Sequence, residues 1–252
     1  MDALAPKLSW RRLPWVIEVV SIGIGYAVYA LVRVLAPHRV KISYQHAADV
    51  IHLEKVVGIY HEIRLNEYIT GKEWLEIPAS YYYATLHFVV TPAVLAWLFR
   101  RHKEIYAPLR SAIVIATAAA LVVYATWPLA PPRYVTPGAV DTVINHPVFW
   151  ADGHGVSGFV NDLAAMPSLH VGWAVWCAVA VMSALRTRWR WLAWLYPLGT
   201  TLVVVATANH YVLDALAGTA VVAVALQLCG VRPTGRVAPT VVTVAEKERA
   251  AA

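Results

Sequence analysis

Charged residues are scarce in this chain of 252 residues: Asp, Glu, Lys and Arg make up 14% of it, against about 25% in an ordinary soluble domain. Apolar residues make up 59%, and their runs extend over nearly the whole chain without a Ser/Gly-rich linker. This balance argues against a soluble protein and predicts one integral membrane domain. The excess of 21 Lys and Arg over 15 Asp and Glu then bears on membrane orientation, and we expect no nucleic-acid partner.

Cysteine is also scarce. The two cysteines, Cys177 and Cys229, both fall within apolar stretches. This placement argues against a disulfide framework or a cysteine-based metal site. We expect no metal and no cofactor.

Six apolar stretches come close to the length of about 20 residues that a helix needs to cross about 30 Å of hydrocarbon. They are residues 14–36, 77–99, 111–128, 166–184, 191–208 and 210–229. The predicted fold is therefore an all-α, integral membrane six-helix bundle. We divide it into a cytoplasmic N-terminus at 1–13, a membrane catalytic domain at 14–229 and a disordered cytoplasmic tail at 230–252.

Two-thirds of the cations mark one side of this bundle. They lie before the first stretch and after the second, fourth and sixth: Lys7, Arg11, Arg12, Arg100, Arg101, Lys103, Arg110, Arg186, Arg188, Arg190, Arg232, Arg236, Lys247 and Arg249. The positive-inside rule makes that side cytoplasmic. We therefore expect a multi-pass protein of the cell membrane, with both termini inside.

A polar segment between the first two stretches has helical periodicity. Its apolar positions are Leu53, Val56, Val57, Tyr60 and Ile63, and the opposite positions are Glu54, Lys55, His61 and Glu62. The pattern predicts an amphipathic helix at about residues 45–70 that lies along the outer membrane interface. A solvated helix packed on the bundle fits the same pattern equally well.

Ionisable residues at membrane depth are costly and are therefore functional candidates. Those in this chain are Glu18, His87, His170, His210 and Asp214. Pro167 suits a first helical turn and places His170 in that turn, while the i,i+4 spacing of His210 and Asp214 stacks both on one helix face. Glu18 and His87 are more often structural at such positions, with contact to a polar group of a substrate as the alternative.

The predicted topology places three of these residues together with Arg133. Arg133, His170, His210 and Asp214 all fall at the outer ends of predicted spans, and Arg133 is the one Lys or Arg between residues 129 and 165. The same outer loop holds His146, His154, Asp141, Asp152 and Asp162. Their irregular spacing favours a solvated loop over a metal site.

This set suits phosphoryl transfer through a histidine. A carboxylate such as Asp214 orients an imidazole and makes it a nucleophile, and a second histidine can protonate the leaving group. Arg133, the Ser168 hydroxyl and the amides of a helix N-terminus would hold the phosphoryl oxygens. Simpler roles stay open: interhelical hydrogen bonds for the histidines, an interfacial anchor for Arg133 and a helix cap for Ser168.

Three short sequences resemble the signature motifs of the type 2 phosphatidic acid phosphatase superfamily. They are Ala-Pro-Pro-Arg (130–133), Pro-Ser-Leu-His (167–170) and His-Tyr-Val-Leu-Asp (210–214). The resemblance covers about residues 77–229 and is greatest to the branch of fungal inositol phosphorylceramide synthase and its bacterial relatives. It implies a six-span bundle and metal-independent catalysis through a phosphohistidine. It also implies that His210 is the nucleophile, Asp214 its partner, His170 the acid/base, and Ser168 and Arg133 the phosphate ligands.

Three positions depart from the family pattern: Thr126 replaces a Lys, Val204 an Arg and Leu169 a Gly. Fewer cations suit a phosphodiester, with one negative charge, better than a monoester that is nearly a dianion at neutral pH. This favours transfer of a phosphorylated head group to an alcohol such as inositol or a lipid alcohol. Lys55, Arg64 or Lys72 would weaken the preference by folding over the site.

The sequence thus predicts an enzyme that cleaves a phosphate ester of a lipid-linked substrate at the extracytoplasmic face. A lipid phosphate or polyprenyl pyrophosphate phosphatase is the alternative within the same chemistry. A lipid-binding or proton-coupled transport protein is the alternative of another class. A metal hydrolase that uses both histidines and Asp214 is a further one.

Overall fold

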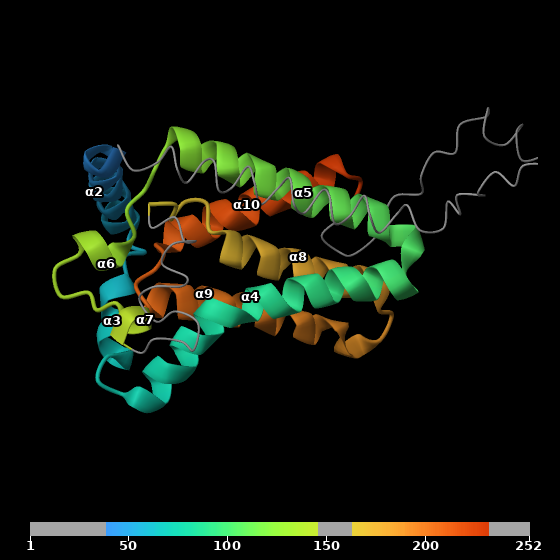
Figure 1. Ribbon diagram of the computed structural model, residues 1–252, viewed down its shortest axis with the longest axis horizontal. Helices are drawn as coiled ribbons and strands as arrows, with labels where there is room; N and C mark the ends of the chain where they lie inside the picture. Colours follow the sequence, from blue (N-terminus) through green and yellow to red (C-terminus); the bar gives the residue numbers. More distant parts are fainter. Residues whose placement is uncertain (1–38, 146–162, 232–252) are drawn as a thin grey trace, which may run out of the picture.

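The computed structural model describes residues 39–145 and 163–231, and its regular structure is helical apart from one isolated bridge (Figure 1). Five helices form a bundle: α4 (Glu73–Arg101), α5 (Lys103–Thr126), α8 (Leu169–Ala184), α9 (Leu195–Ala206) and α10 (Val212–Leu228). The all-α prediction is confirmed. The predicted span at 14–36, with Glu18, and residues 232–252 of the predicted tail lie outside the described residues.

The bundle helices overlap the predicted apolar stretches, with two main differences. Helix α5 begins at Lys103, eight residues before the stretch predicted at 111–128. The stretch at 191–208 begins within a 3₁₀ helix, η3 (Arg188–Trp194), before α9. By length and composition, α4 and α5 can each cross a membrane, whereas α8 and α10 are apolar but have 16 and 17 residues. The six-span arrangement stays a prediction.

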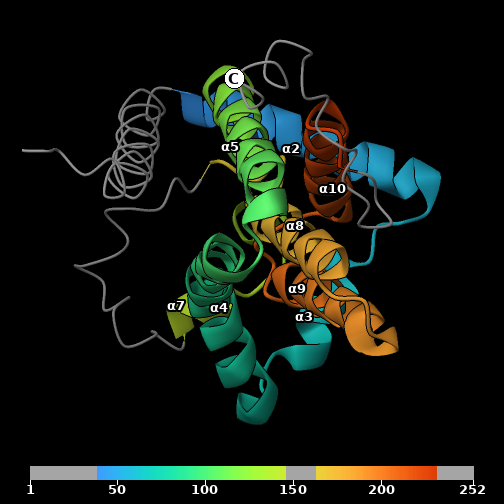
Figure 2. The same ribbon diagram turned by 90° about the vertical axis from the view of Figure 1, so that its right-hand side faces the viewer.

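Helix α8 is the central element of the bundle. It packs against α4, α5, α9 and α10 (Figure 2), and most of its residues are buried. A helix that is apolar all round, as α8 is, has no side suited to water and is stable only when surrounded. Its N-terminal residues are therefore fixed at the centre of one end of the bundle.

Two glycines bring α8 and α10 into backbone contact. A Cβ atom on Gly218 would lie 2.2 Å from the carbonyl oxygen of Ser168, and one on Gly172 would lie 3.1 Å from that of Gly218. Small residues at such a crossing let two helices approach more closely than larger side chains permit. The amide of Ser168 also donates a hydrogen bond of 3.0 Å to the carbonyl oxygen of Asp214. The beginnings of α8 and α10 are thereby joined.

The prediction of a single amphipathic helix at about 45–70 is wrong. The segment forms α2 (Val40–Val57) and α3 (Glu62–Ile69), because Gly58, with φ +79°, ends α2 in the left-handed region that glycine adopts readily. Helix α2 is seen end-on in Figure 1 and lengthwise in Figure 2, so it lies across one end of the bundle.

Two of the polar positions of this segment, Glu54 and Glu62, are turned inward, whereas Lys55 and His61 are exposed. Glu54 and Glu62 are 0% and 1% exposed, whereas Val56 is 70% exposed. The expectation of a solvated polar face is therefore wrong for these two carboxyl groups, because both cap α10. The outward apolar positions, Leu53, Val56 and Val57, remain compatible with a membrane interface.

Different elements lie at the two ends of the bundle. The α4–α5 connection, the α8–α9 connection with Arg186, Arg188 and Arg190, and the end of α10 lie at one end (Figure 1). Helices α2 and α3 and two short helices, α6 (Pro132–Val135) and α7 (Thr142–Asn145), lie at the other. The candidate site residues lie at this second end.

Candidate active site

His210 lies directly before α10, whose N-cap is Tyr211. The prediction that His210 and Asp214 share one helix face is therefore wrong for His210. The chain leaves α9 through Ala208, at φ +54°, and the amide of His210 donates to the carbonyl oxygen of Val204 at 3.1 Å. This turn still places Nδ1 of His210 3.4 Å from Oδ2 of Asp214.

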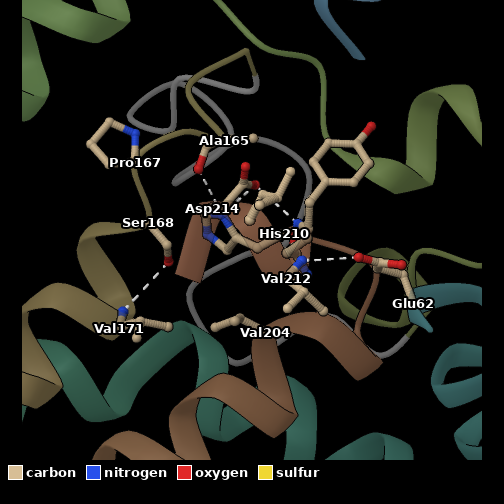
Figure 3. A network of polar contacts seen from close by, with 12 residues as sticks. Glu62, Ala165, Pro167, Ser168, Val171, Val204, His210, Val212 and Asp214 are labelled. Atoms are coloured by element: carbon tan, nitrogen blue, oxygen red, sulfur yellow. Dashed lines mark hydrogen bonds and ion pairs between the residues drawn. The ribbon is translucent and has the colours of Figure 1, made fainter. Parts of the chain in front are cut away.

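The surroundings of His210 define its tautomer (Figure 3). Its Nδ1 atom is also 2.9 Å from the carbonyl oxygen of Ala165, and a carbonyl oxygen can only accept. The hydrogen of neutral His210 therefore belongs on Nδ1, which leaves the lone pair on Nε2. His210 is 4% and Asp214 0% exposed, so this pair is shielded from bulk water.

The Ala165 carbonyl is positioned by a short pairing of two loops. Leu129 accepts from the Ala165 amide at 3.3 Å and donates to Leu163 at 2.8 Å. The phenol of Tyr211 donates to the carbonyl oxygen of Ala130 at 3.0 Å. The Tyr211 hydrogen bond thus joins the first and third motifs, and the loop pairing positions the carbonyl that faces His210.

His170 lies in the first turn of α8, as predicted. Its ring centroid is 5.5 Å from that of His210. From α4, the ring of Tyr83 stacks on His170 at 4.5 Å and the ring of His87 meets it edge-on at 4.3 Å. Three rings from α4 and the start of α10 therefore confine His170, and His87 is a neighbour of the site.

Arg133, in α6, is held by two side chains. Its Nη1 atom donates to Oδ1 of Asn209 at 2.5 Å, and its Nε atom is 2.8 Å from Oδ2 of Asp141. Burial by itself would lower the pKa of Arg133, but Tyr83 and Asp141 raise it above its usual value. The guanidinium is therefore a permanent cation beside the residue that precedes His210.

Ser168 is the N-cap of α8. Its Oγ atom accepts a hydrogen bond of 3.5 Å from the amide of Val171, and the residue is fully buried. Pro167, expected in the first helical turn, lies just before this cap because the helix begins at Leu169. A serine hydroxyl that accepts from an amide can still donate its own hydrogen.

The structure thus brings together Arg133, Ser168, His170, His210 and Asp214, which the sequence had placed in three separate segments. A family model described as the PAP2 superfamily matches residues 48–228. The chain belongs to the PAP2 superfamily. No curated protein and no solved structure matches it significantly. The matched segment includes all five residues and nearly all of the described helices.

Members of the PAP2 superfamily are phosphatases, so membership supports enzymatic activity on lipid phosphates in general terms. Two of the three positions that depart from the expected motifs, Thr126 and Val204, have different surroundings. Thr126 is exposed and its hydroxyl donates to the carbonyl oxygen of Val122 at 2.8 Å. Val204 is buried, and its carbonyl oxygen accepts a hydrogen bond from the amide of His210.

Two of the three loop cations that might have replaced these residues have partners elsewhere. Lys55 lies over the ring of Tyr60, and Lys72 lies over Tyr68 and donates to its carbonyl oxygen. Arg64 is exposed on α3. Arg133, by contrast, contacts Asn209, the residue directly before His210.

Sequence reasoning missed Asp141 and Asn209 as partners of Arg133. The sequence places Asp141 in a predicted solvated loop, yet a lone cation in a long outer loop indicates that a nearby carboxylate pairs with it. His146, His154, Asp152 and Asp162 lie outside the described residues. Among those described, no group of three His, Cys, Asp or Glu side chains is arranged to hold a metal ion.

Proposed function

We propose that this PAP2-superfamily protein cleaves a phosphate ester of a lipid-linked substrate through a phosphohistidine on His210. The observation that carries the proposal is the environment of Nδ1, which meets a carbonyl oxygen at 2.9 Å and a carboxylate at 3.4 Å. Both partners favour a hydrogen on Nδ1 and a nucleophilic Nε2. A carboxylate there also stabilises the imidazolium that forms during attack.

The reaction then proceeds in two steps. Nε2 of His210 attacks phosphorus and forms an N–P bond while the P–O bond to the leaving group breaks, and His170 donates a proton to the departing oxygen. In the second step His170 takes a proton from the acceptor, whose oxygen attacks phosphorus and releases His210. The ring separation of 5.5 Å lets both histidines reach one phosphoryl group.

Arg133, the Ser168 hydroxyl and the first amides of α8 are the proposed ligands of the phosphoryl oxygens. The charge of Arg133 is already matched by Asp141 at 2.8 Å. A site with so little free positive charge favours a phosphodiester over a dianionic monoester. We therefore favour head-group transfer to an alcohol such as inositol or a lipid alcohol, at the extracytoplasmic face of the cell membrane.

A lipid phosphate or polyprenyl pyrophosphate phosphatase is the second candidate, and superfamily membership favours it. It differs only in the acceptor, because water replaces the alcohol in the second step. Two other candidates make different predictions, which the same experiment tests. One is a metal hydrolase built on His170, His210 and Asp214, and the other is a transport protein.

The test uses the full chain purified into lipid nanodiscs. It is incubated with a phosphomonoester lipid and a phosphodiester lipid, with and without inositol or diacylglycerol, and products are identified by mass spectrometry. Head-group transfer supports our preference, and release of inorganic phosphate alone overturns it. His210→Ala should abolish turnover and covalent labelling by a ³²P-labelled substrate, with His102→Ala, at the far end of α4, as the matched control.

Two inhibitors separate the mechanisms. Vanadate, an analogue of the phosphoryl transition state, should inhibit in the presence of a chelator. Activity that a chelator removes and zinc restores would replace our proposal with the metal hydrolase. Intact turnover in His210→Ala would show that the proposed nucleophile is wrong, and a complete lack of turnover with binding retained would favour the transport protein.

A further inference from the structure

Three carboxyl groups from three helices converge on the first turn of α10. The amide of Tyr211 donates to Asp214 at 3.0 Å. The next two amides, of Val212 and Leu213, donate to Glu62 at 2.9 Å and to Glu54 at 2.7 Å. The first amides of a helix lack partners within the helix. Here α3 and α2 supply acceptors for two of these amides, directly after His210.

The two glutamates use only half of each carboxyl group in this way. Their Oε1 atoms accept from α10, whereas their Oε2 atoms are buried and receive no hydrogen bond from any described residue. The two carboxyl groups are within hydrogen-bonding reach of each other. Two adjoining carboxylates in a buried place cannot both ionise without a large cost.

A further carboxyl group near Glu54 increases this cost. Asp214 on α10 also disfavours ionisation of Glu54, and the phenol of Tyr211 lies in the same electrostatic surroundings. Burial, first, and then the contact with Glu62 raise the pKa of Glu54 to about 9. Glu54 therefore carries a proton at neutral pH, and its carboxyl hydrogen can satisfy the otherwise bare Oε2 of Glu62.

We propose that Glu54 and Glu62 share one proton and together act as positioning residues for the His210–Asp214 pair. This inference rests on the proposed role of His210. The pair holds the second and third amides of the α10 turn, so that Oδ2 of Asp214 serves the Tyr211 amide and His210. Neither glutamate belongs to a recognised motif, and the inference gives α2 and α3 a role in catalysis.

The test compares single and double glutamine variants. In Glu54→Gln or Glu62→Gln, one amide group donates to the remaining carboxylate, so each variant reproduces the shared hydrogen bond. We expect kcat within twofold of the wild type and a Tm at or above it. In the double variant either orientation of the amides sets a donor against a donor. We expect kcat to fall at least tenfold with KM changed less than twofold, since the pair does not touch substrate.

The matched control is Glu67→Gln with Glu73→Gln, which removes the same two acidic groups at exposed positions on α3 and α4 and should leave kcat and Tm unchanged. A double variant no worse than the singles would overturn the shared proton. So would single variants that each lose as much activity as the double variant, because both carboxylates would then be needed in ionised form.

An infrared difference spectrum tests the proton without turnover. At neutral pH the wild type should show the carbonyl stretch of a protonated carboxyl group that Glu54→Gln lacks. Absence of this difference would overturn the inference even if the enzyme is active. If the band is present but no lipid phosphate is ever cleaved, the shared proton stands and the proposed function fails. The spectrum and the single variants keep the test decisive if the double variant does not fold.

Discussion

At the scale of single residues, the candidate site contains a permanent cation, Arg133, and a carboxylate, Asp141, that balances its charge. Arg133 is held between Asn209 and Asp141, and His210 between Ala165 and Asp214. Each chemically active group thus has a second residue that fixes its orientation. The roles of the supporting residues can be tested separately from those of the reacting ones.

His170, as general acid, should matter in proportion to the basicity of the leaving group. We expect His170→Ala to lower kcat about 10²–10⁴-fold for a lipid whose leaving group is an alkoxide. The same variant should lose far less with a nitrophenyl phosphodiester, because that leaving group departs without a proton. Steady-state rates on the two substrates provide the measurement, and equal losses on both would argue against the acid role.

Asp141 balances the charge of Arg133, the proposed phosphate ligand. Asp141→Asn removes the partner of Arg133 and adds one positive charge to the site. We expect the ratio of kcat/KM for a dianionic phosphomonoester to that for a phosphodiester to rise about tenfold, which corresponds to about 1.4 kcal/mol. Asp49→Asn, at an exposed position of α2, is the control. An unchanged ratio would mean that Asp141 does not tune substrate charge.

At the scale of elements, the starts of α8 and α10 form one unit, because their backbones touch at Gly172 and Gly218 and a main-chain hydrogen bond joins Ser168 to Asp214. The segment comprising α2 and α3 then covers the first turn of α10. Each of these two contacts leads to a prediction.

Gly218→Ala should separate the two helix starts. Its Cβ would lie 2.2 Å from the backbone oxygen of Ser168, and a backbone atom cannot move aside as a side chain can. We expect a destabilisation of about 2 kcal/mol and a loss of most activity, measured by thermal unfolding and turnover. Gly199→Ala is the control, because its Cβ meets only the Tyr82 hydroxyl at 3.4 Å. A fully active Gly218→Ala protein would contradict the contact.

Glu54 gives stability a defined pH dependence. Its pKa is about 9 in the folded protein and close to 4.5 when unfolded, so the unfolded chain releases this proton first as pH rises. The contribution of the protonated form is complete below about pH 4.5 and is lost progressively up to about pH 9. The Tm of Glu54→Gln relative to the wild type should therefore rise over this window, and a pH-independent difference would refute the assigned protonation.

Helix positions followed from the sequence more readily than contacts between helices did. Apolar runs and the Pro167–Ser168 start predict α4, α8 and α10 to within four residues, because hydrophobic burial depends on local composition. Helix α5 begins eight residues before its apolar run, in a polar segment that composition does not mark as part of a span. The inward face of α2 did not follow. Periodicity identifies two opposite faces, but which face is buried depends on the partner, and the partner here is a helix end far along the chain.

The site divides in the same way. Its motifs can be identified from the sequence because the chemistry requires particular residue types at short spacings, as for His210 and Asp214. Asp141 and Asn209 were missed since the loop that carries Asp141 to Arg133 has no periodic pattern. The turn at Ala208, which removes His210 from the helix, likewise depends on how α9 ends.

At the scale of the whole molecule, the cation-rich connections and the candidate site lie at opposite ends of the bundle (Figure 1). The 16 residues of α8 span about 24 Å between them, which approaches the thickness of the hydrocarbon layer. If the positive-inside rule holds for this chain, the site opens at the opposite surface.

Single cysteines test this orientation in a Cys229→Ala background, with the buried Cys177 retained. Pro137→Cys, in the exposed loop after α6, should react with an impermeant maleimide in intact cells. Arg101→Cys, at the end of α4, should react only after permeabilisation. The reverse pattern would place the site in the cytoplasm and invalidate the predicted topology.

Because of the glycine contact between α8 and α10, the geometry of the site should not depend on the thickness of the bilayer. Membranes of different thickness change the tilt of helices and the order of lipid chains, but the separation of two backbones that already touch is set by atomic radii. The distance between the imidazoles of His170 and His210 should therefore be the same in thin and thick membranes. Differences in rate between such membranes would then report how fast lipids arrive and depart, while the lifetime of the proposed covalent intermediate should stay constant.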